Sequence, residues 1–254
     1  MSGWIVGVFL ALIAFHTLYA LSRSIDKARQ KDENARVHSR LNVAFQTVIF
    51  LLGARLAYDW GALSRDLLSP VAIAAGLLAG HFIFGLSLLA THSSMEDARG
   101  HFLDFGSVWD FVVEHPYVLS RFIYVGISEE IIWRGATQPA LASALGWGLG
   151  DGIDPLWPTL AAIGIVAVAF SVVHDHFFHN APMVTAEFLG FALLLGVLYY
   201  WTGSLIMVII IHAVRDIEIA YLEFAINVHE FGDEEKAAAE VERVYRHGLR
   251  NSHE

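Results

Sequence analysis

The chain has 254 residues, of which 56% are hydrophobic and 17% charged, and its mean hydropathy is +0.51. Soluble domains of this length are usually less apolar, so we predict an all-α, polytopic membrane helical bundle. The chain has no cysteine, which excludes disulfides and thiolate chemistry, and its net charge of -10 without a basic patch makes nucleic-acid binding a poor hypothesis.

Seven stretches have the apolarity of membrane-spanning helices and lengths near the roughly 20 residues that a span requires. Residues 3–21 carry no charge and no positively charged start, so we expect a retained helix and not a cleaved signal peptide. Residues 41–60 carry Arg55 and Asp59, and residues 70–91 carry only His81. The remaining stretches are residues 117–145, 159–176, 185–201 and 203–225.

Two further segments complete the predicted organisation. Residues 226–254 should form a short cytoplasmic tail with an amphipathic helix in EEKAAAEVERVYR. A re-entrant or interfacial segment is expected around residues 102–113. We therefore expect one membrane domain, residues 1–225, followed by the tail.

Lys and Arg are distributed unevenly between the two sets of predicted loops. With seven spans, residues 22–40, the loop that contains Arg99 and the C-terminal tail share one side and hold 11 of the 16 basic residues. The other side holds only Arg65, and four basic residues lie within helices. Because positively charged loops stay in the cytoplasm, we predict an outside N-terminus and a cytoplasmic C-terminus.

The segment GISEEIIWRG, residues 126–135, places three charges inside a predicted span. A charge at mid-span costs roughly 2.5–3.5 kcal/mol on insertion scales, so such residues are functional candidates. Glu130 and Arg134 are spaced i,i+4 and should pair, whereas Glu129 points about 100° away. Alternatively, all three charges form a buried network that only fixes helix packing.

Two more helices carry polar residues at the same spacing. Phe170 and His174 are i,i+4 in FSVVH, and His212 and Asp216 are i,i+4 in HAVRD. Each histidine alone would be interpreted as a hydrogen-bonded bundle histidine. A carboxylate with two histidines can instead activate water or bind a metal. In that case Glu129 is the base with His174, and His212 with Asp216 stabilises charge on a carbonyl oxygen.

The ordered motifs EEIIWR (129–134), FSVVH (170–174) and HAVRD (212–216) resemble those of the CPBP family of CAAX prenyl proteases and bacteriocin-processing (Abi) proteins. The segment FLGFALLLGVLYYWTGSLIMVIIIHAVRD is also similar to the family's stretch between its second and third motifs, and the likeness covers residues 117–225. The resemblance implies an intramembrane endopeptidase.

Carried over by position, the resemblance implies that Glu129 and His174 activate water and that His212 and Asp216 stabilise the oxyanion. Glu130 and Arg134 would support this site. The prenyl proteases have Asn where this chain has Asp216. Since Asn can donate a hydrogen bond and an ionised Asp cannot, this departure concerns the mechanism.

We expect no cofactor, although zinc held by Glu129, His174 and His212 is the alternative if the activity is metal-dependent. The cluster of His174, Asp175, His176 and His179 is a weaker metal candidate, because a continuous helix would not place its three histidines on one face. It becomes feasible if the helix ends at His174.

The alternatives to a protease are a non-catalytic scaffold or assembly subunit with the same fold, and a transporter that uses the buried charges. No inverted repeat or pair of broken helices favours a transporter. Expected partners are a membrane-associated protein or peptide substrate, the lipid bilayer and a membrane protein complex, with no nucleic acid. The expected location is a bacterial or archaeal inner membrane.

Overall fold

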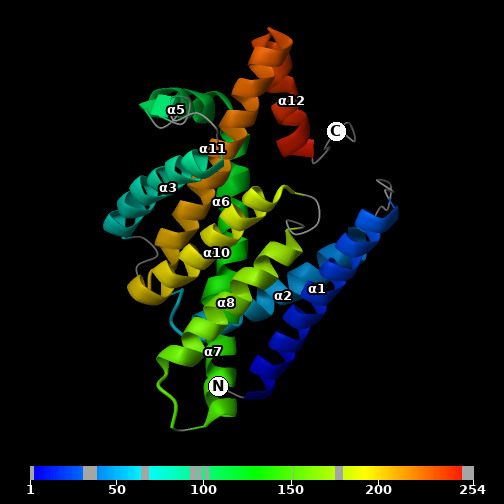
Figure 1. Ribbon diagram of the computed structural model, residues 1–254, viewed down its shortest axis with the longest axis vertical. Coiled ribbons are helices and arrows are strands. Elements are labelled where there is room, and N and C mark those ends of the chain that lie inside the picture. Colours follow the sequence, from blue (N-terminus) through cyan, green and yellow to red (C-terminus); the bar gives the residue numbers. More distant parts are fainter. Residues whose placement is uncertain are drawn as a thin grey trace. The chain divides into compact units, whose positions relative to one another are not determined.

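The computed structural model describes residues 3–30, 39–63, 69–91, 96, 99–100, 103–150, 152–174 and 180–247. All regular structure in these residues is helical, which confirms the predicted all-α class (Figure 1). The helices are α1 (Gly3–Gln30), α2 (Ser39–Asp59), α3 (Pro70–Thr91), α5 (Phe105–Glu114), α6 (Pro116–Glu130), the π-helix η1 (Ile131–Thr137), α7 (Gln138–Leu149), α8 (Leu156–Val173), α10 (Pro182–Thr202), α11 (Leu205–Phe231) and α12 (Glu234–His247).

Four helical segments are long and apolar enough to cross a membrane: Gly3–Ile25, Pro70–Thr91, Leu156–Val173 and Pro182–Thr202. They coincide, with small shifts at their ends, with four of the seven predicted spans. The other three predicted spans are also helical, but they contain charged residues such as Arg55, Glu130 and Glu218. The total of seven spans therefore stays a prediction.

The helices divide into two compact units. The first unit comprises residues 1–67 and 128–208, and the second comprises residues 68–127 and 209–254. Helices α6 and α11 each contribute residues to both units. The predicted division into residues 1–225 and 226–254 is a different one and stays a prediction.

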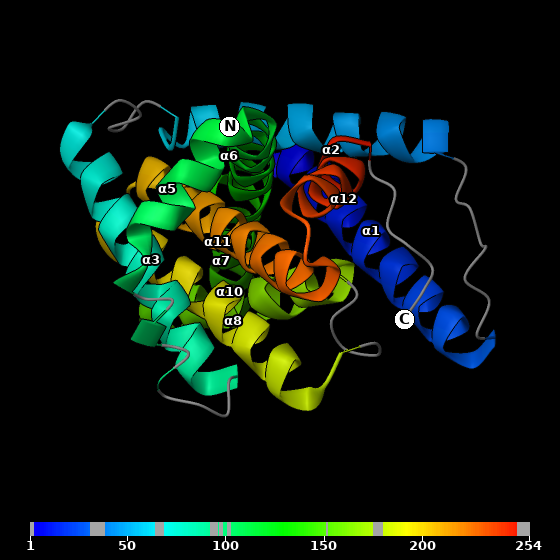
Figure 2. The same cartoon turned by 90° about the horizontal axis from the view of Figure 1, so that it is seen from above.

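In the first unit, α8 packs against α10 (Figure 2) and also against α1 and α7, and α2 packs against η1. Its core is a cluster of buried side chains that includes Phe9, Leu56, Trp133, Phe170 and Phe188. Because α8 and α10 are apolar on all sides, their sequences alone do not select a buried face. The aromatic side chains mark the faces that meet inside this unit.

In the second unit, α12 is the predicted amphipathic helix and packs through one face. Ala237 and Val241 are buried, one turn apart, and Val241 lies in a cluster with Phe111 of α5, Phe122 of α6 and Ile217 of α11. Helix α5 covers most of the segment expected to be re-entrant or interfacial. Its position in the membrane stays a prediction.

The predicted span 117–145 is interrupted by η1, which is a correction to a continuous α-helix. Pro139, two residues after the end of η1, has no N–H, so the i→i−4 ladder cannot continue through this turn. The backbone N–H of Gln138 donates instead to the carbonyl of Trp133, and the Thr137 hydroxyl donates to the Ile132 carbonyl at 2.7 Å. Such π-turns occur often at functional sites.

Candidate active site

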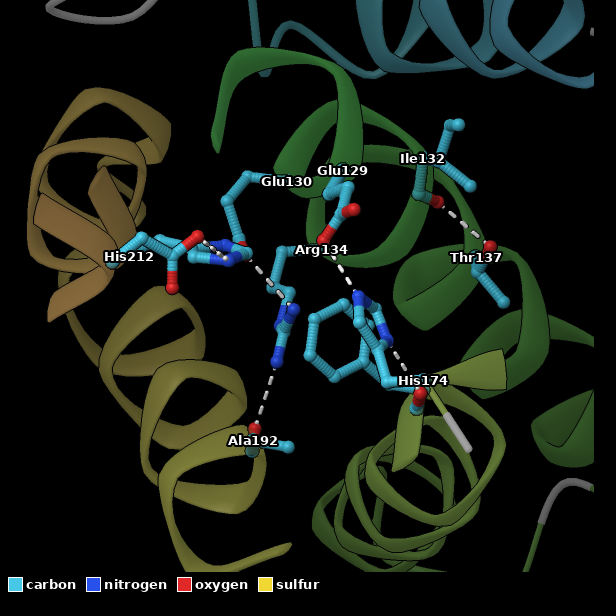
Figure 3. A network of polar contacts seen from close by, with 10 residues as sticks. Glu129, Glu130, Ile132, Arg134, Thr137, His174, Ala192 and His212 are labelled. Atoms are coloured by element: carbon cyan, nitrogen blue, oxygen red, sulfur yellow. Dashed lines mark hydrogen bonds and ion pairs between the residues drawn. The ribbon is translucent and has the colours of Figure 1, made fainter. Parts of the chain in front are cut away.

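The EEIIWR motif begins at the end of α6 and continues into η1, and its two glutamates have different environments. Arg134 and Glu130 are both fully buried, and Arg134 Nη1 donates to Glu130 Oε1 at 2.9 Å. Arg134 Nη2 donates to the Ala192 carbonyl of α10 at 3.0 Å (Figure 3). The ion pair predicted from the i,i+4 spacing is therefore present, and it ties the motif to α10.

Phe170 of the FSVVH motif lies beneath this ion pair. The Arg134 guanidinium carbon is 4.6 Å from the centre of its ring, a cation–π contact. The Trp133 ring meets Phe170 edge-on with centroids 5.7 Å apart, and the Phe188 ring stacks on it at 5.4 Å. Phe170 is thus an aromatic support for the buried arginine, a role that the spacing of the motif did not reveal.

Glu129 turns away from Arg134, as predicted, and meets His174 at the end of α8. Glu129 Oε2 and His174 Nε2 lie 3.2 Å apart, and their side chains are 25% and 28% exposed (Figure 3). The neighbouring Glu130–Arg134 pair is 0% exposed. One carboxylate of the motif is therefore sealed in the core, whereas the other remains accessible beside a histidine.

The orientation of the His174 ring follows from its backbone contact. His174 Nδ1 lies 2.8 Å from the Phe170 carbonyl oxygen. A carbonyl can only accept, so Nδ1 carries a proton, and Nε2 is the nitrogen that faces Glu129. In the neutral ring Nε2 is an acceptor, and it can therefore accept a hydrogen bond from a water molecule alongside the carboxylate.

His212 and Asp216 of the HAVRD motif lie one turn apart on the part of α11 that belongs to the second unit. His212 Nε2 and Asp216 Oδ2 are 3.5 Å apart, and their side chains are 4% and 18% exposed. This distance exceeds the usual 2.7–3.2 Å of an N–H···O bond, so Nε2 is not committed to Asp216 alone. The Arg215 guanidinium lies 3.8 Å from Asp216 Oδ1.

Two polar contacts were not predicted from the sequence. Gln138 Nε2 donates to the Gly196 carbonyl at 3.1 Å, a second link to α10 one turn beyond Arg134. In the second unit, His81 Nδ1 lies 2.6 Å from Oε1 of Glu218, whose side chain is 1% exposed. His81 stood out as the only titratable residue of its predicted span, but its partner is 137 residues away.

The described residues of the site include two side chains suited to binding a metal. Glu129 Oε2 and His174 Nε2 are both atoms of the kind that bind zinc, and the contact of His174 Nδ1 with a backbone carbonyl is common among metal-bound histidines. The described residues contain no group of three or more His, Cys, Asp or Glu side chains placed to hold a metal ion. Helix α8 ends at Val173, and Asp175, His176 and His179 lie outside the described residues.

Comparison with known families identifies the region that carries all three motifs. Residues 111–217 match the family model described as type II CAAX prenyl endopeptidase Rce1-like. No curated protein and no solved structure matches the chain. Together with the apolar helices, the match indicates an integral membrane protein with a protease-type fold. Residues 111–217 are thus similar to the Rce1-like type II CAAX prenyl endopeptidases, in agreement with the resemblance predicted from the three motifs.

Proposed function

We propose that this protein is an intramembrane endopeptidase that hydrolyses a peptide bond of a membrane-associated protein or peptide. The observation that carries this proposal is the accessible Glu129–His174 pair, 3.2 Å apart, beside the fully buried Glu130–Arg134 pair. A network that served only helix packing would have no need for a carboxylate and an imidazole that are partly exposed and directed at each other.

In the proposed reaction, Glu129 and the unprotonated Nε2 of His174 both accept hydrogen bonds from one water molecule. Glu129 removes a proton from that water as its oxygen attacks the peptide carbonyl carbon. The same proton then passes to the departing amine when the C–N bond breaks. The products are a carboxylic acid and an amine, and Glu129 returns to its ionised state.

By the resemblance, His212 acts on the carbonyl oxygen, which becomes negatively charged during the attack. Donation from the ring N–H would stabilise this oxyanion, and removal of one such donor typically slows turnover by about 10²–10³-fold. Asp216 would hold the ring in place. Glu130 and Arg134 would maintain the backbone that presents Glu129.

A metal is the alternative way to activate the water. Glu129 and His174 would then bind zinc, with His212 as the third ligand implied by the resemblance, and the zinc would lower the pKa of a bound water. We propose the glutamate mechanism, because Nε2 of His174 and the carboxylate can share a water directly.

Membrane proteomics on cells that carry the wild-type protein or Glu129→Gln would test the proposal. We expect membrane-protein fragments that appear only with the wild type, and their ends define a reporter peptide for purified protein in proteoliposomes. Cleavage of that reporter by folded Glu129→Gln at the wild-type rate would refute the assignment.

A further inference from the structure

Helix α11 carries a second polar contact, on the side opposite to His212 and Asp216. Glu218 is almost completely buried, and His81 of α3 lies 2.6 Å from it, within the second unit. A buried carboxylate is costly unless it is paired or hydrogen-bonded. Its other oxygen, Oε2, makes no hydrogen bond with any residue that the structure describes, so its contact with α3 runs through His81.

Helices α3 and α11 also approach each other closely at Val214, one turn before Glu218 on α11. A Cβ atom placed on Gly80 would lie 2.8 Å from Val214 Cβ and 3.3 Å from Ile211 Cα. Only glycine allows α3 and α11 to come this near, because a methyl group here would push them apart. Neighbouring residues of α3 thus make both contacts, Gly80 with Val214 and His81 with Glu218.

The geometry of α11 relates these contacts to the HAVRD motif. Val214 and Glu218 are spaced i,i+4 and form one stripe, which faces α3. His212 and Asp216 form a second i,i+4 stripe. His212 lies two residues before Val214, and Asp216 lies two residues before Glu218. Two residues correspond to about 200° on an α-helix, so the two stripes lie on nearly opposite sides.

We infer that Gly80, His81 and Glu218 are positioning residues that set the rotation and register of α11, and hence the direction of His212 and Asp216. The close glycine contact limits the distance between the helices, and the His81–Glu218 hydrogen bond selects one rotation of α11. This inference rests on the proposed endopeptidase function, because it holds that the His81–Glu218 hydrogen bond aligns His212, the proposed oxyanion donor.

The kinetic test uses the reporter peptide defined above and three variants. Glu218→Leu removes the acceptor, and Gly80→Ala separates the helices while it leaves both polar side chains in place. A misplacement of about 1 Å can slow an enzyme roughly 10²-fold, so we expect kcat to fall by about this factor in both variants. KM should stay unchanged, and so should reporter affinity measured in a Glu129→Gln background. Glu218→Gln retains an acceptor for the His81 N–H and should stay within about threefold of the wild type.

A matched control separates alignment from stability. Tyr221, one turn beyond Glu218, donates to Asp104 Oδ2 at 2.9 Å and so also links α11 to a neighbouring segment. Tyr221→Phe should lower the thermal stability without changing kcat. If Tyr221→Phe lowered kcat as much as Glu218→Leu and Gly80→Ala do, then any weakened contact of α11 would slow turnover. That result would overturn the inference.

A second measurement needs no activity. The chain lacks cysteine, so spin labels can be attached at Leu78→Cys and Ile226→Cys, whose native side chains are 76% and 47% exposed. The distance between the labels should shift by on the order of 1–2 Å in Glu218→Leu and Gly80→Ala, and stay fixed in Glu218→Gln. An unchanged distance in both perturbing variants, or an unchanged kcat alongside a shifted distance, would overturn the inference. If the wild type cleaves nothing, the proposed function fails, and the spin-label distances alone decide whether these residues set the rotation of α11.

Discussion

Substitution by Gln should affect the two adjacent glutamates of the EEIIWR motif differently: stability should fall more at Glu130, and activity should fall more at Glu129. Glu130→Gln keeps the size of the side chain and one acceptor oxygen, but it leaves the fully buried Arg134 without its negative partner. Loss of one member of a buried ion pair typically costs about 3–5 kcal/mol. Arg134 retains its contacts with the Ala192 carbonyl and the Phe170 ring, so we expect the lower end of this range.

Glu129→Gln removes a charge that is 25% exposed, at 3.2 Å from His174. Accessible pairs contribute about 1 kcal/mol or less, so the two variants should differ in unfolding free energy by at least about 2 kcal/mol. Activity should show the reverse order, because the proposal makes Glu129 the base: Glu129→Gln abolishes cleavage, and Glu130→Gln reduces it.

The assay is unfolding of the purified protein by SDS in mixed micelles, with reporter cleavage measured on the same preparations. The double variant Glu130→Gln/Arg134→Met is the control, since it removes both buried charges and should be more stable than Glu130→Gln alone. Equal destabilisation by Glu129→Gln and Glu130→Gln would refute the reasoning from burial. A double variant less stable than Glu130→Gln would show that Arg134 stabilises the protein through its other contacts.

Three further predictions concern the chemistry and the sidedness. Asp216→Asn should keep substantial turnover because Asn accepts and donates, whereas Asp216→Leu should lose about 10²–10³-fold; wild-type turnover in Asp216→Leu would make the position structural. Purified protein should cleave the reporter after chelation and dialysis, and stoichiometric zinc whose removal stops cleavage would establish the metal mechanism instead. Finally, the loop charges predict a cytoplasmic C-terminus. A cysteine at the exposed Lys236 should therefore be shielded from a membrane-impermeant thiol reagent in intact cells, whereas one at the exposed Gly152 should react. The opposite labelling pattern would reverse the predicted orientation.

Contacts within one helix were predictable from the sequence. The Glu130–Arg134 pair and the proximity of His212 to Asp216 follow from i,i+4 spacing, because residues one turn apart lie on the same face. The break expected between residues 185–201 and 203–225 is also present, one residue later, at Gly203, which takes up a left-handed conformation with φ of 64°. Such features depend on local backbone geometry, so spacing and residue type suffice to locate them.

The tertiary structure decided which helices bring their polar residues together. Spacing showed that Glu129 turns away from Arg134, but only the packing of α8 places His174 beside it. The His81–Glu218 contact likewise joins residues 137 positions apart, and α3, which is apolar on all sides, gave no direction for it. The reason is physical: a helix that is apolar on every side can bury any of its faces, so the choice among them depends on the close fit of residues such as Gly80 and Phe170 against neighbouring helices.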